Sequence, residues 1–528
     1  MPPKRSNVAR VKYALLLAGL LACSAPHGGG VAGHPEVPDG APRLVVLVVI
    51  DQWPEWSFEA KRSAFHAGFE RLLSEGEWRV GEHPSAATLT APGHALLGTG
   101  AASATSGILA NEWWHRDLHE VLMAVEDENH ADSTKWLRVR GLGDALAGTP
   151  AKAVALSLKA RAALLPLGHA GLAMFYDASA GRFVAHQLAN SVPTPVTRPW
   201  LEAHTAAHPL QLAPWTLLPE TGGLSGVPDE RAGEFGEKGF GATFPHDPQA
   251  TKHPNDAVFA MPLGNDILFD LAESAIDGEQ LGADKIPDLL VISLSAHDYV
   301  GHGWGHESEE QWDMELRLDQ RIATFLDALD KKVGAGKWAM IVTSDHGAAP
   351  LPESMHGGRL TPDDVEKGAN AAASAVLGPG HWVDNAHYPN IYLSAAFFAQ
   401  PPGERKSAIQ RVLNALRSFP SIEKAGVVAD VASHCETRHG DDRALCLTFD
   451  PERSGDLYYL PARGYIMDTE DEPAATAHGS IHDYDRQVPL LILPPGRTKH
   501  APATTPVPEM IPMETVAPLL AKWLAVKL

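Results

Sequence analysis

The sequence is poor in cysteine, in basic side chains and in long apolar runs. Among 528 residues there are three cysteines, and 43 Lys and Arg stand against 65 Asp and Glu, for a formal net charge of −22. Three cysteines are too few to expect zinc bound mainly by thiolates. The acidic excess argues against a protein that grips nucleic acid through a basic face. A bound phosphate must therefore meet locally placed positive charge.

The apolar run at residues 13–22 is too short to cross a bilayer comfortably, and it follows four basic side chains. This pattern is typical of a secretory signal over residues 1–22. The segment LLAC resembles the lipobox of bacterial lipoproteins, which would make Cys23 the lipidated first residue, ahead of a small-residue linker over 23–42. Leu21 is a less usual occupant of its position, so simple secretion stays an alternative. We expect an exported bacterial protein that is periplasmic or anchored to the outer membrane through Cys23.

The two remaining cysteines, Cys435 and Cys446, are close in sequence. In an oxidising compartment such a pair favours a disulfide, and two unpaired thiols are the alternative.

Five apolar segments predict strands, and four of them run into polar residues at their exits. The segments lie at 43–51, 153–161, 288–298, 338–346 and 488–493. Nearly continuous apolar runs are typical of strands covered on both faces. Between two of them, apolar residues from 316 to 329 recur at largely helical spacing, with glycines beyond. This βαβ pattern predicts an α/β fold with a mostly parallel sheet flanked by helices, whose ligands bind at the carboxyl ends of the strands.

Two stretches interrupt the strand and helix alternation. Residues 190–287 are rich in Pro and Gly, and residues 351–470 are similarly broken, with one helix near 404–418. We interpret both as insertions that cap the site of a single catalytic domain over 43–528.

Metal-ligand residue types follow the predicted strands. Carboxylates and imidazoles suit zinc, and two sets of three could hold two ions. Each residue alone is a weak signal, and spacing does not exclude His94, His297, His306 or His482. The candidate ligands are Asp51, Asp298, His302, Asp345, His346 and His478.

Thr90 stands two residues before Pro92, at the predicted start of a helix. Proline is favoured in a first turn, where free backbone N–H groups and the helix dipole favour an oxyanion and a phosphate. Lys159 and Arg161 follow a strand, and an arginine fork can bind two phosphate oxygens. Taken alone, Thr90 merely caps a helix, Lys159 and Arg161 are a solvated basic pair, and Asn111 is a turn residue.

Together these motifs resemble the alkaline phosphatase superfamily and, within it, the PafA-type periplasmic alkaline phosphatases. The resemblance runs from about residue 43 to the end, through VVIDQW, TLTAPGH, GILANEWW, SLKARAALL, GHAGLAMFYD, HDYVGHGWG, TSDHG and HGSIHDYDRQVPLL in the family's order. It implies an alkaline-phosphatase-like fold with two Zn²⁺. One zinc would be held by Asp298, His302 and His478, and the other by Asp51, Asp345, His346 and the nucleophile.

The resemblance also implies the chemistry. Thr90 would be the nucleophile, with Thr88 in support, and Asn111, Lys159 and Arg161 would contact the phosphoryl group. We therefore expect a zinc-dependent phosphate monoester hydrolase with a phosphothreonine intermediate and a broad range of small phosphorylated substrates.

Other functions stay open at this point. A phosphodiesterase of the nucleotide pyrophosphatase type shares the ligands and the threonine, but Lys159 and Arg161 favour a dianionic monoester. A sulfatase is disfavoured, because the nucleophile position offers Thr instead of the Cys or Ser that matures to formylglycine. A lipoprotein that only binds metal or phosphate is the non-enzymatic alternative.

Overall fold

The computed structural model describes residues 40–468 and 473–528. The predicted signal segment, Cys23 and all but the last residues of the linker lie outside the described residues. The chain divides into Met1–Pro35 and Glu36–Leu528, and every feature below belongs to the second unit. In the described part of the chain, no helix combines the length and apolar character needed to cross a bilayer.

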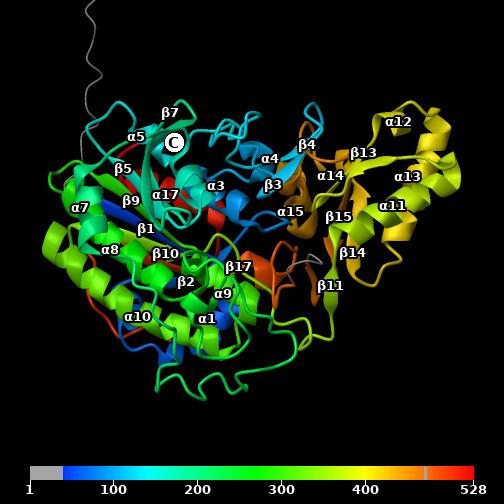
Figure 1. The fold of residues 1–528 in the computed structure, drawn as a ribbon. Coiled ribbons are helices and arrows are strands. Elements are labelled where there is room, and N and C mark those ends of the chain that lie inside the picture. Colours follow the sequence, from blue (N-terminus) through cyan, green and yellow to red (C-terminus); the bar gives the residue numbers. More distant parts are fainter. Residues whose placement is uncertain (1–39, 469–472) are drawn as a thin grey trace, which may run out of the picture. The chain divides into compact units, whose positions relative to one another are not determined.

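A ten-stranded mixed sheet forms the centre of the fold (Figure 1), with the order β18-β2-β17-β10-β1-β9-β5-β6-β7-β8. The neighbours from β10 to β6 are parallel, and the strands outside them pair mostly antiparallel. The predicted α/β class with a mostly parallel sheet is therefore confirmed. The strands are β1 (Leu44–Ile50), β2 (Glu77–Glu82), β5 (Ala153–Ser157), β6 (Ala170–Asp177), β7 (Arg182–Ala189), β8 (Val192–Pro195), β9 (Asp288–Leu294), β10 (Trp338–Thr343), β17 (Gln487–Leu493) and β18 (Val507–Pro512).

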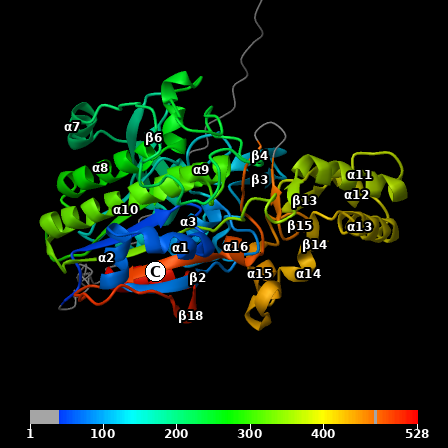
Figure 2. The ribbon, with the colours of Figure 1, turned by 90° about the horizontal axis from the view of Figure 1, so that it is seen from below.

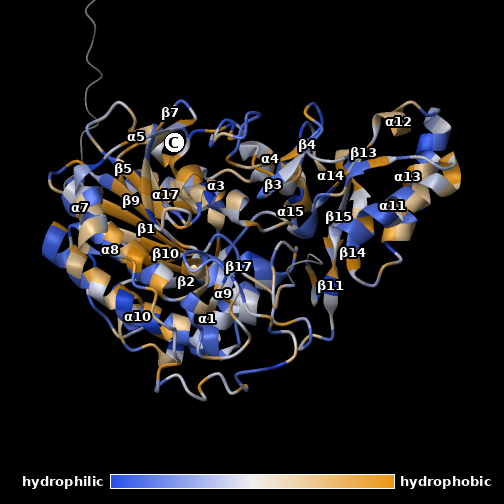
Figure 3. Cartoon of the chain, viewed as in Figure 1, coloured by the Kyte–Doolittle hydropathy of each residue, from blue (hydrophilic) through white to orange (hydrophobic). Residues whose placement is uncertain are grey.

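All five segments predicted as strands are strands, namely β1, β5, β9, β10 and β17. Every residue of β1, β5, β9 and β10 is buried, so their continuous apolar runs are covered on both faces. Figure 3 shows these strands as an apolar band inside the molecule.

Helices cover both faces of the sheet. Val45, Leu47 and Val49 of β1 belong to one core cluster, whereas Val46 and Val48 belong to another, as expected for side chains that alternate along a strand. The first face carries α3 (Thr90–Thr99), α5 (Leu142–Leu146), α6 (Ala160–Leu164) and α17 (Val516–Trp523). The second carries α1 (Glu55–Lys61), α2 (Gly68–Glu75), α7 (Pro199–Ala207), α8 (Leu263–Gly278), α9 (Ala296–Trp304) and α10 (Glu309–Leu329).

The predicted helix between β9 and β10 is α10, which begins after Ser308, whose hydroxyl accepts the Gln311 backbone N–H at 3.1 Å. Its apolar face includes Leu318, Ile322 and Phe325, all buried. Strand β1 lies between β9 and β10, so the βαβ unit spans two strand positions.

The insertion predicted near 190–287 is narrower in the structure. Strand β8 pairs with β7 at the sheet edge, and α8 packs Leu268, Phe269 and Ala272 into the main core. Helix α8 was not predicted, because the surrounding sequence is rich in Pro and Gly. Its apolar face belongs to the helical layer that covers the sheet. The irregular part is the segment between α7 and α8.

Residues from 358 to 467 are more regular than their broken sequence suggests (Figure 2). The predicted helix near 404–418 is α13 (Pro402–Leu416), which packs with α11 (Pro362–Leu377). Beside them lies a four-stranded sheet of β12 (Val383–Asn385), β13 (Asn390–Leu393), β15 (Leu457–Pro461) and β14 (Ile422–Val427). These elements share a core cluster of their own.

The predicted disulfide is confirmed. Cys435 and Cys446 are bonded, with Cα atoms 5.4 Å apart, and the bond joins a short 3₁₀ turn to α15 (Gly440–Thr448).

Candidate metal centre

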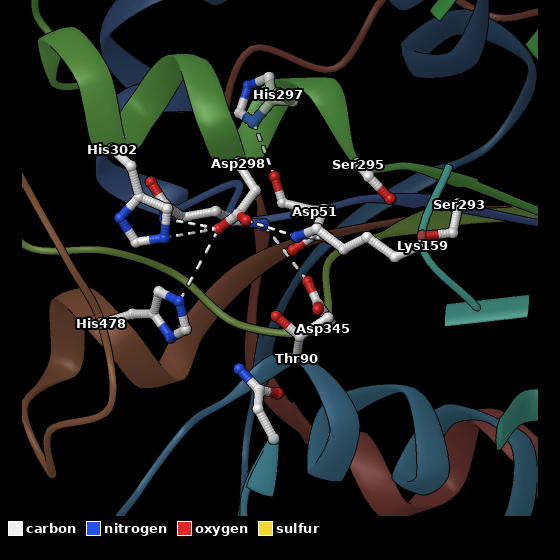
Figure 4. A network of polar contacts seen from close by, with 12 residues as sticks. Asp51, Thr90, Lys159, Ser293, Ser295, His297, Asp298, His302, Asp345 and His478 are labelled. Atoms are coloured by element: carbon white, nitrogen blue, oxygen red, sulfur yellow. Dashed lines mark hydrogen bonds and ion pairs between the residues drawn. The ribbon is translucent and has the colours of Figure 1, made fainter. Parts of the chain in front are cut away.

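The three carboxylates of the site lie beyond the carboxyl ends of three neighbouring parallel strands (Figure 4). Asp51 directly follows β1, Asp298 lies in the first turn of α9 after β9, and Asp345 follows β10 by two residues. Strand β1 lies between the other two. The predicted convergence of polar strand exits is therefore present, and all three aspartate residues are at most 3% exposed.

The first group of ligand atoms lies around His346. Potential ligand atoms of Asp51, Asp345 and His346 are all within 4.8 Å of one another. His346 Nε2 lies 3.5 Å from Asp51 Oδ1 and 3.3 Å from Thr90 Oγ1. Because its Nδ1–H donates to the Gly347 carbonyl at 3.0 Å, Nε2 carries the lone pair that faces these oxygens.

The second group lies around Asp298. Its Oδ1 is 3.2 Å from His302 Nε2 and 3.8 Å from His478 Nε2. The opposite ring nitrogens donate to backbone carbonyls, His302 Nδ1 to Thr476 at 2.8 Å and His478 Nδ1 to Thr88 at 2.7 Å. Such bonds fix the tautomer of metal-ligating histidines and leave Nε2 free for a cation. Thr88, the predicted supporting residue, acts here through its carbonyl.

The two groups touch. His346 also falls within 4.8 Å of Asp298 and His478, and the rings of His346 and His478 stack with centroids 3.5 Å apart. All six predicted ligands thus meet at one place, and their division into two sets of three stays a prediction.

The buried negative charge of this cluster favours bound cations. Burial and the neighbouring Asp345 carboxylate raise the pKa of Asp51 well above its usual range. Within the described residues, Asp51 Oδ1 is buried and accepts no hydrogen bond. Three buried carboxylates need compensating positive charge. Three carboxylates and three imidazoles without thiolate form a donor set that suits divalent cations such as zinc.

Lys159 supplies part of that charge. Its Nζ lies 2.8 Å from Asp51 Oδ2, 2.5 Å from Asp298 Oδ2 and 4.8 Å from the centroid of the Tyr299 ring. Burial lowers the pKa of Lys159, but Asp298 and Asp51 outweigh that effect and raise it above its usual value. The ammonium therefore joins carboxylates of both groups.

Thr90 is the first residue of α3, next to Leu89 at the N-cap, so it lies at the start of the helix as predicted. The Ala91 N–H donates to Asn111 Oδ1 at 2.8 Å, which orients the Asn111 amide. Arg161 lies in the first turn of α6. Across residues 40–468 and 473–528, Arg161 has no ion pair, its buried Nε has no hydrogen-bond partner, and the Asn111 amide nitrogen donates to no protein group.

Sequence reasoning missed Gln52, which follows Asp51 and is fully buried. Its side-chain Nε2 donates to Asp298 Oδ1 at 2.7 Å, and its backbone N–H to Asp345 Oδ1 at 3.3 Å. Only its position beside Asp51 in the motif VVIDQW could have signalled this role.

The four histidines that spacing could not exclude are placed differently. His94 lies in the site, with Nδ1 3.1 Å from Asp345 Oδ2 and Nε2 2.8 Å from Ser293 Oγ. His297 and His306 form a second buried group with Glu315, whose carboxylate pairs with Lys61 at 2.6 Å. This group borders the site, since His297 Nδ1 lies 2.8 Å from the Asp51 carbonyl oxygen and His306 Nε2 lies 3.0 Å from Gln52 Oε1. His482 contacts the Pro461 carbonyl instead.

Comparisons with known proteins identify the family of this chain. The family model of type I phosphodiesterase / nucleotide pyrophosphatase matches residues 45–485. Alkaline phosphatase PafA of Elizabethkingia meningoseptica is 29% identical over 86% of this chain and 87% of its own. Alkaline phosphatase PhoV of Synechococcus elongatus is 34% identical over 60% of this chain and 62% of its own.

Solved structures give the same result. The crystal structure of wild-type PafA superposes with a TM-score of 0.79 at 26% identity, covering 92% of this chain and 96% of that one. Murine ectonucleotide pyrophosphatase/phosphodiesterase 5 shares the fold, with a TM-score of 0.54 at 14% identity over 92% and 95%. The chain therefore belongs to the type I phosphodiesterase / nucleotide pyrophosphatase family of the alkaline phosphatase superfamily, in which it is PafA-like.

Proposed function

We propose that this phosphate ester hydrolase is a zinc-dependent alkaline phosphatase that cleaves phosphate monoesters through a phosphothreonine intermediate and accepts a broad range of small substrates. Alkaline phosphatase homologues over most of the chain support the enzyme class. The observation that carries the proposal is the meeting of Thr90 with six metal-ligand side chains at the exits of neighbouring strands.

The assignment of the ions follows the family resemblance. Asp298, His302 and His478 would hold one Zn²⁺, and Asp51, Asp345, His346 and Thr90 the other. Bound ions of this kind supply Lewis acidity that favours an ionised nucleophile and offsets charge on the departing oxygen.

Thr90 begins the reaction. Its hydroxyl proton passes to solvent, Oγ1 forms a bond to phosphorus while the ester P–O bond breaks, and the alcohol leaves with a proton taken from solvent. Water then cleaves the phosphothreonine to give inorganic phosphate and restores the hydroxyl. The position of Thr90 at the start of α3 supports this step, because the helix dipole favours negative charge there.

Arg161, Asn111 and Lys159 would hold the phosphoryl oxygens. Arg161 brings a guanidinium without an ion pair among the described residues, and Asn111 brings N–H donors that no described group uses. A variant of PafA was solved with one threonine, one asparagine, one lysine and one arginine replaced. In that variant the threonine and asparagine, and the lysine and arginine, have the same spacings as Thr90 with Asn111 and Lys159 with Arg161 here.

A phosphodiesterase is the second candidate, because the matching family model describes phosphodiesterases and pyrophosphatases. A diester has one fewer non-bridging charge, and paired cations at 159 and 161 favour the dianionic monoester. To test this, the purified protein is mixed with a chromogenic monoester and with a diester, each with and without chelator. We expect chelator-sensitive turnover with the monoester preferred. Faster diester turnover would favour the second candidate, and no turnover of either would favour a protein that only binds.

We also propose export from the cytoplasm, with Cys23 as a lipid attachment point. The Cys435–Cys446 disulfide supports an oxidising compartment. Membrane fractionation of the full-length protein beside a Cys23→Ser variant tests this, and equal membrane association of the two would count against lipidation.

A further inference from the structure

We propose that Gln52 is a positioning residue of the metal centre, which holds the Asp298 carboxylate in the orientation that a cation needs. This inference rests on the proposed function, because it assumes that Asp298 binds an ion. Gln52 is not itself one of the predicted ligands.

The side-chain amide of Gln52 joins two ligand atoms. Its Nε2 donates to Asp298 Oδ1 at 2.7 Å and lies 3.1 Å from His302 Nε2. His302 Nδ1–H donates to the Thr476 carbonyl, so its Nε2 carries the single lone pair that a cation would take. Asp298 Oδ1 has a further lone pair for a cation while it accepts the amide hydrogen, so the hydrogen bond to Asp298 is the one that can persist beside a bound ion (Figure 4 shows Asp298 and His302 side by side).

The backbone of Gln52 reaches the other group. Its N–H donates to Asp345 Oδ1 at 3.3 Å, and the preceding residue is Asp51. The side chain of Gln52 therefore contacts Asp298 and His302, and its backbone contacts Asp345. The residue thus touches predicted ligands of both ions.

His306 fixes which way the amide points. Its Nε2 lies 3.0 Å from Gln52 Oε1. A carbonyl oxygen only accepts, so His306 donates through Nε2–H, and the NH₂ end of the amide must face Asp298. His306 is 1% exposed and its Nδ1 has no hydrogen-bond partner in the described residues. The bond to Gln52 is therefore the polar contact that orients this buried ring.

Two local features of the backbone accompany this arrangement. Gln52 has φ of 58°, in the left-handed region that side chains other than glycine rarely adopt. In α9, a Cβ at Gly301 would lie 2.1 Å from Gln52 Oε1 and 3.0 Å from His306 Nε2, so only glycine leaves room for both. Strain of this kind concentrates at functional sites.

The test uses a variant that removes the side-chain amide of residue 52 without adding backbone strain. Gln52→Gly removes the amide and relieves the left-handed φ, so a loss of ion affinity cannot be ascribed to added strain. Protein stripped by chelator is titrated with Co²⁺ and followed by its visible absorption, and Asp298→Asn identifies which binding phase belongs to the Asp298 site.

We expect Gln52→Gly to fold, to lose about 10- to 100-fold in Co²⁺ affinity in the Asp298 phase, and to keep the other phase, as for other groups that orient metal ligands. His306→Phe should weaken the same phase. His246→Gln is the matched control, because His246 is as buried as His306 but contacts Glu310 instead of Gln52.

Unchanged affinity in Gln52→Gly, or equal weakening of both phases, would overturn the positioning role while leaving the proposed function standing. A wild-type protein that binds no Co²⁺ would overturn both.

Discussion

Gly93→Ala should disable the enzyme without touching a reacting atom. Gly93 lies one turn after Thr90 in α3, and a Cβ added there would lie 2.2 Å from the backbone oxygen of Asp345 and 2.8 Å from its Cβ. Real Cβ atoms essentially never approach within 3.0 Å of such atoms. The start of α3 and the Asp345–His346 segment must therefore separate by roughly 1 Å to restore ordinary contact distances.

That displacement acts directly on the site. It lengthens the 3.3 Å contact between Thr90 Oγ1 and His346 Nε2. A misplacement of about 1 Å can cost on the order of 100-fold in rate. Overpacking of this kind also lowers the free energy of unfolding by about 1–3 kcal/mol.

The assay is kcat/KM on a chromogenic phosphate monoester, measured beside thermal unfolding so that loss of activity is separated from loss of fold. Gly403→Ala is the control, since a Cβ there meets nothing within 4 Å. A folded Gly93→Ala variant with wild-type kcat/KM would show that the contact between α3 and Asp345 does not place the nucleophile.

Three further predictions concern single side chains. Thr90→Ala should abolish turnover while metal content stays near wild type, because the other six ligands remain; full activity would refute the nucleophile. Arg161→Ala should harm monoester turnover more than diester turnover, and equal losses would count against a phosphoryl contact. Burial and the charge of Glu59 raise the pKa of Glu55 to about 8, so the neutral acid is favoured in the folded protein. The free energy of unfolding therefore keeps the full contribution of neutral Glu55 below the ordinary pKa of a glutamate, and loses it as the pH rises through about 8. Denaturant unfolding of the wild type should show this loss of up to a few kcal/mol, and Glu55→Gln should not.

The central strands, and the meeting of the polar residues at their exits, could be predicted because each rests on local sequence. Strand β1 is an uninterrupted apolar run that ends in Asp51, and β9 and β10 repeat the pattern, so parallel packing alone brings their exits together. The disulfide needed only two cysteines 11 positions apart.

The parts that were missed depend on packing across the chain. Helix α8 and the sheet of β12 to β15 carry mixed sequences that become apolar faces only against their partners. Gln52 depends on a left-handed φ and on the space beside Gly301, 249 positions later, which no local pattern reports. The stacking of His346 on His478 likewise joins distant segments.

The order β9-β1-β10 has a consequence for how this catalyst can diverge. Asp51 follows the middle strand, so its backbone lies between the strands that lead to Asp298 and Asp345, and main-chain hydrogen bonds hold adjacent strands about 4.8 Å apart. Side-chain replacements can change single contacts of the site, but the spacing of the three backbone segments that carry its carboxylates is set by main-chain hydrogen bonding and resists mutation.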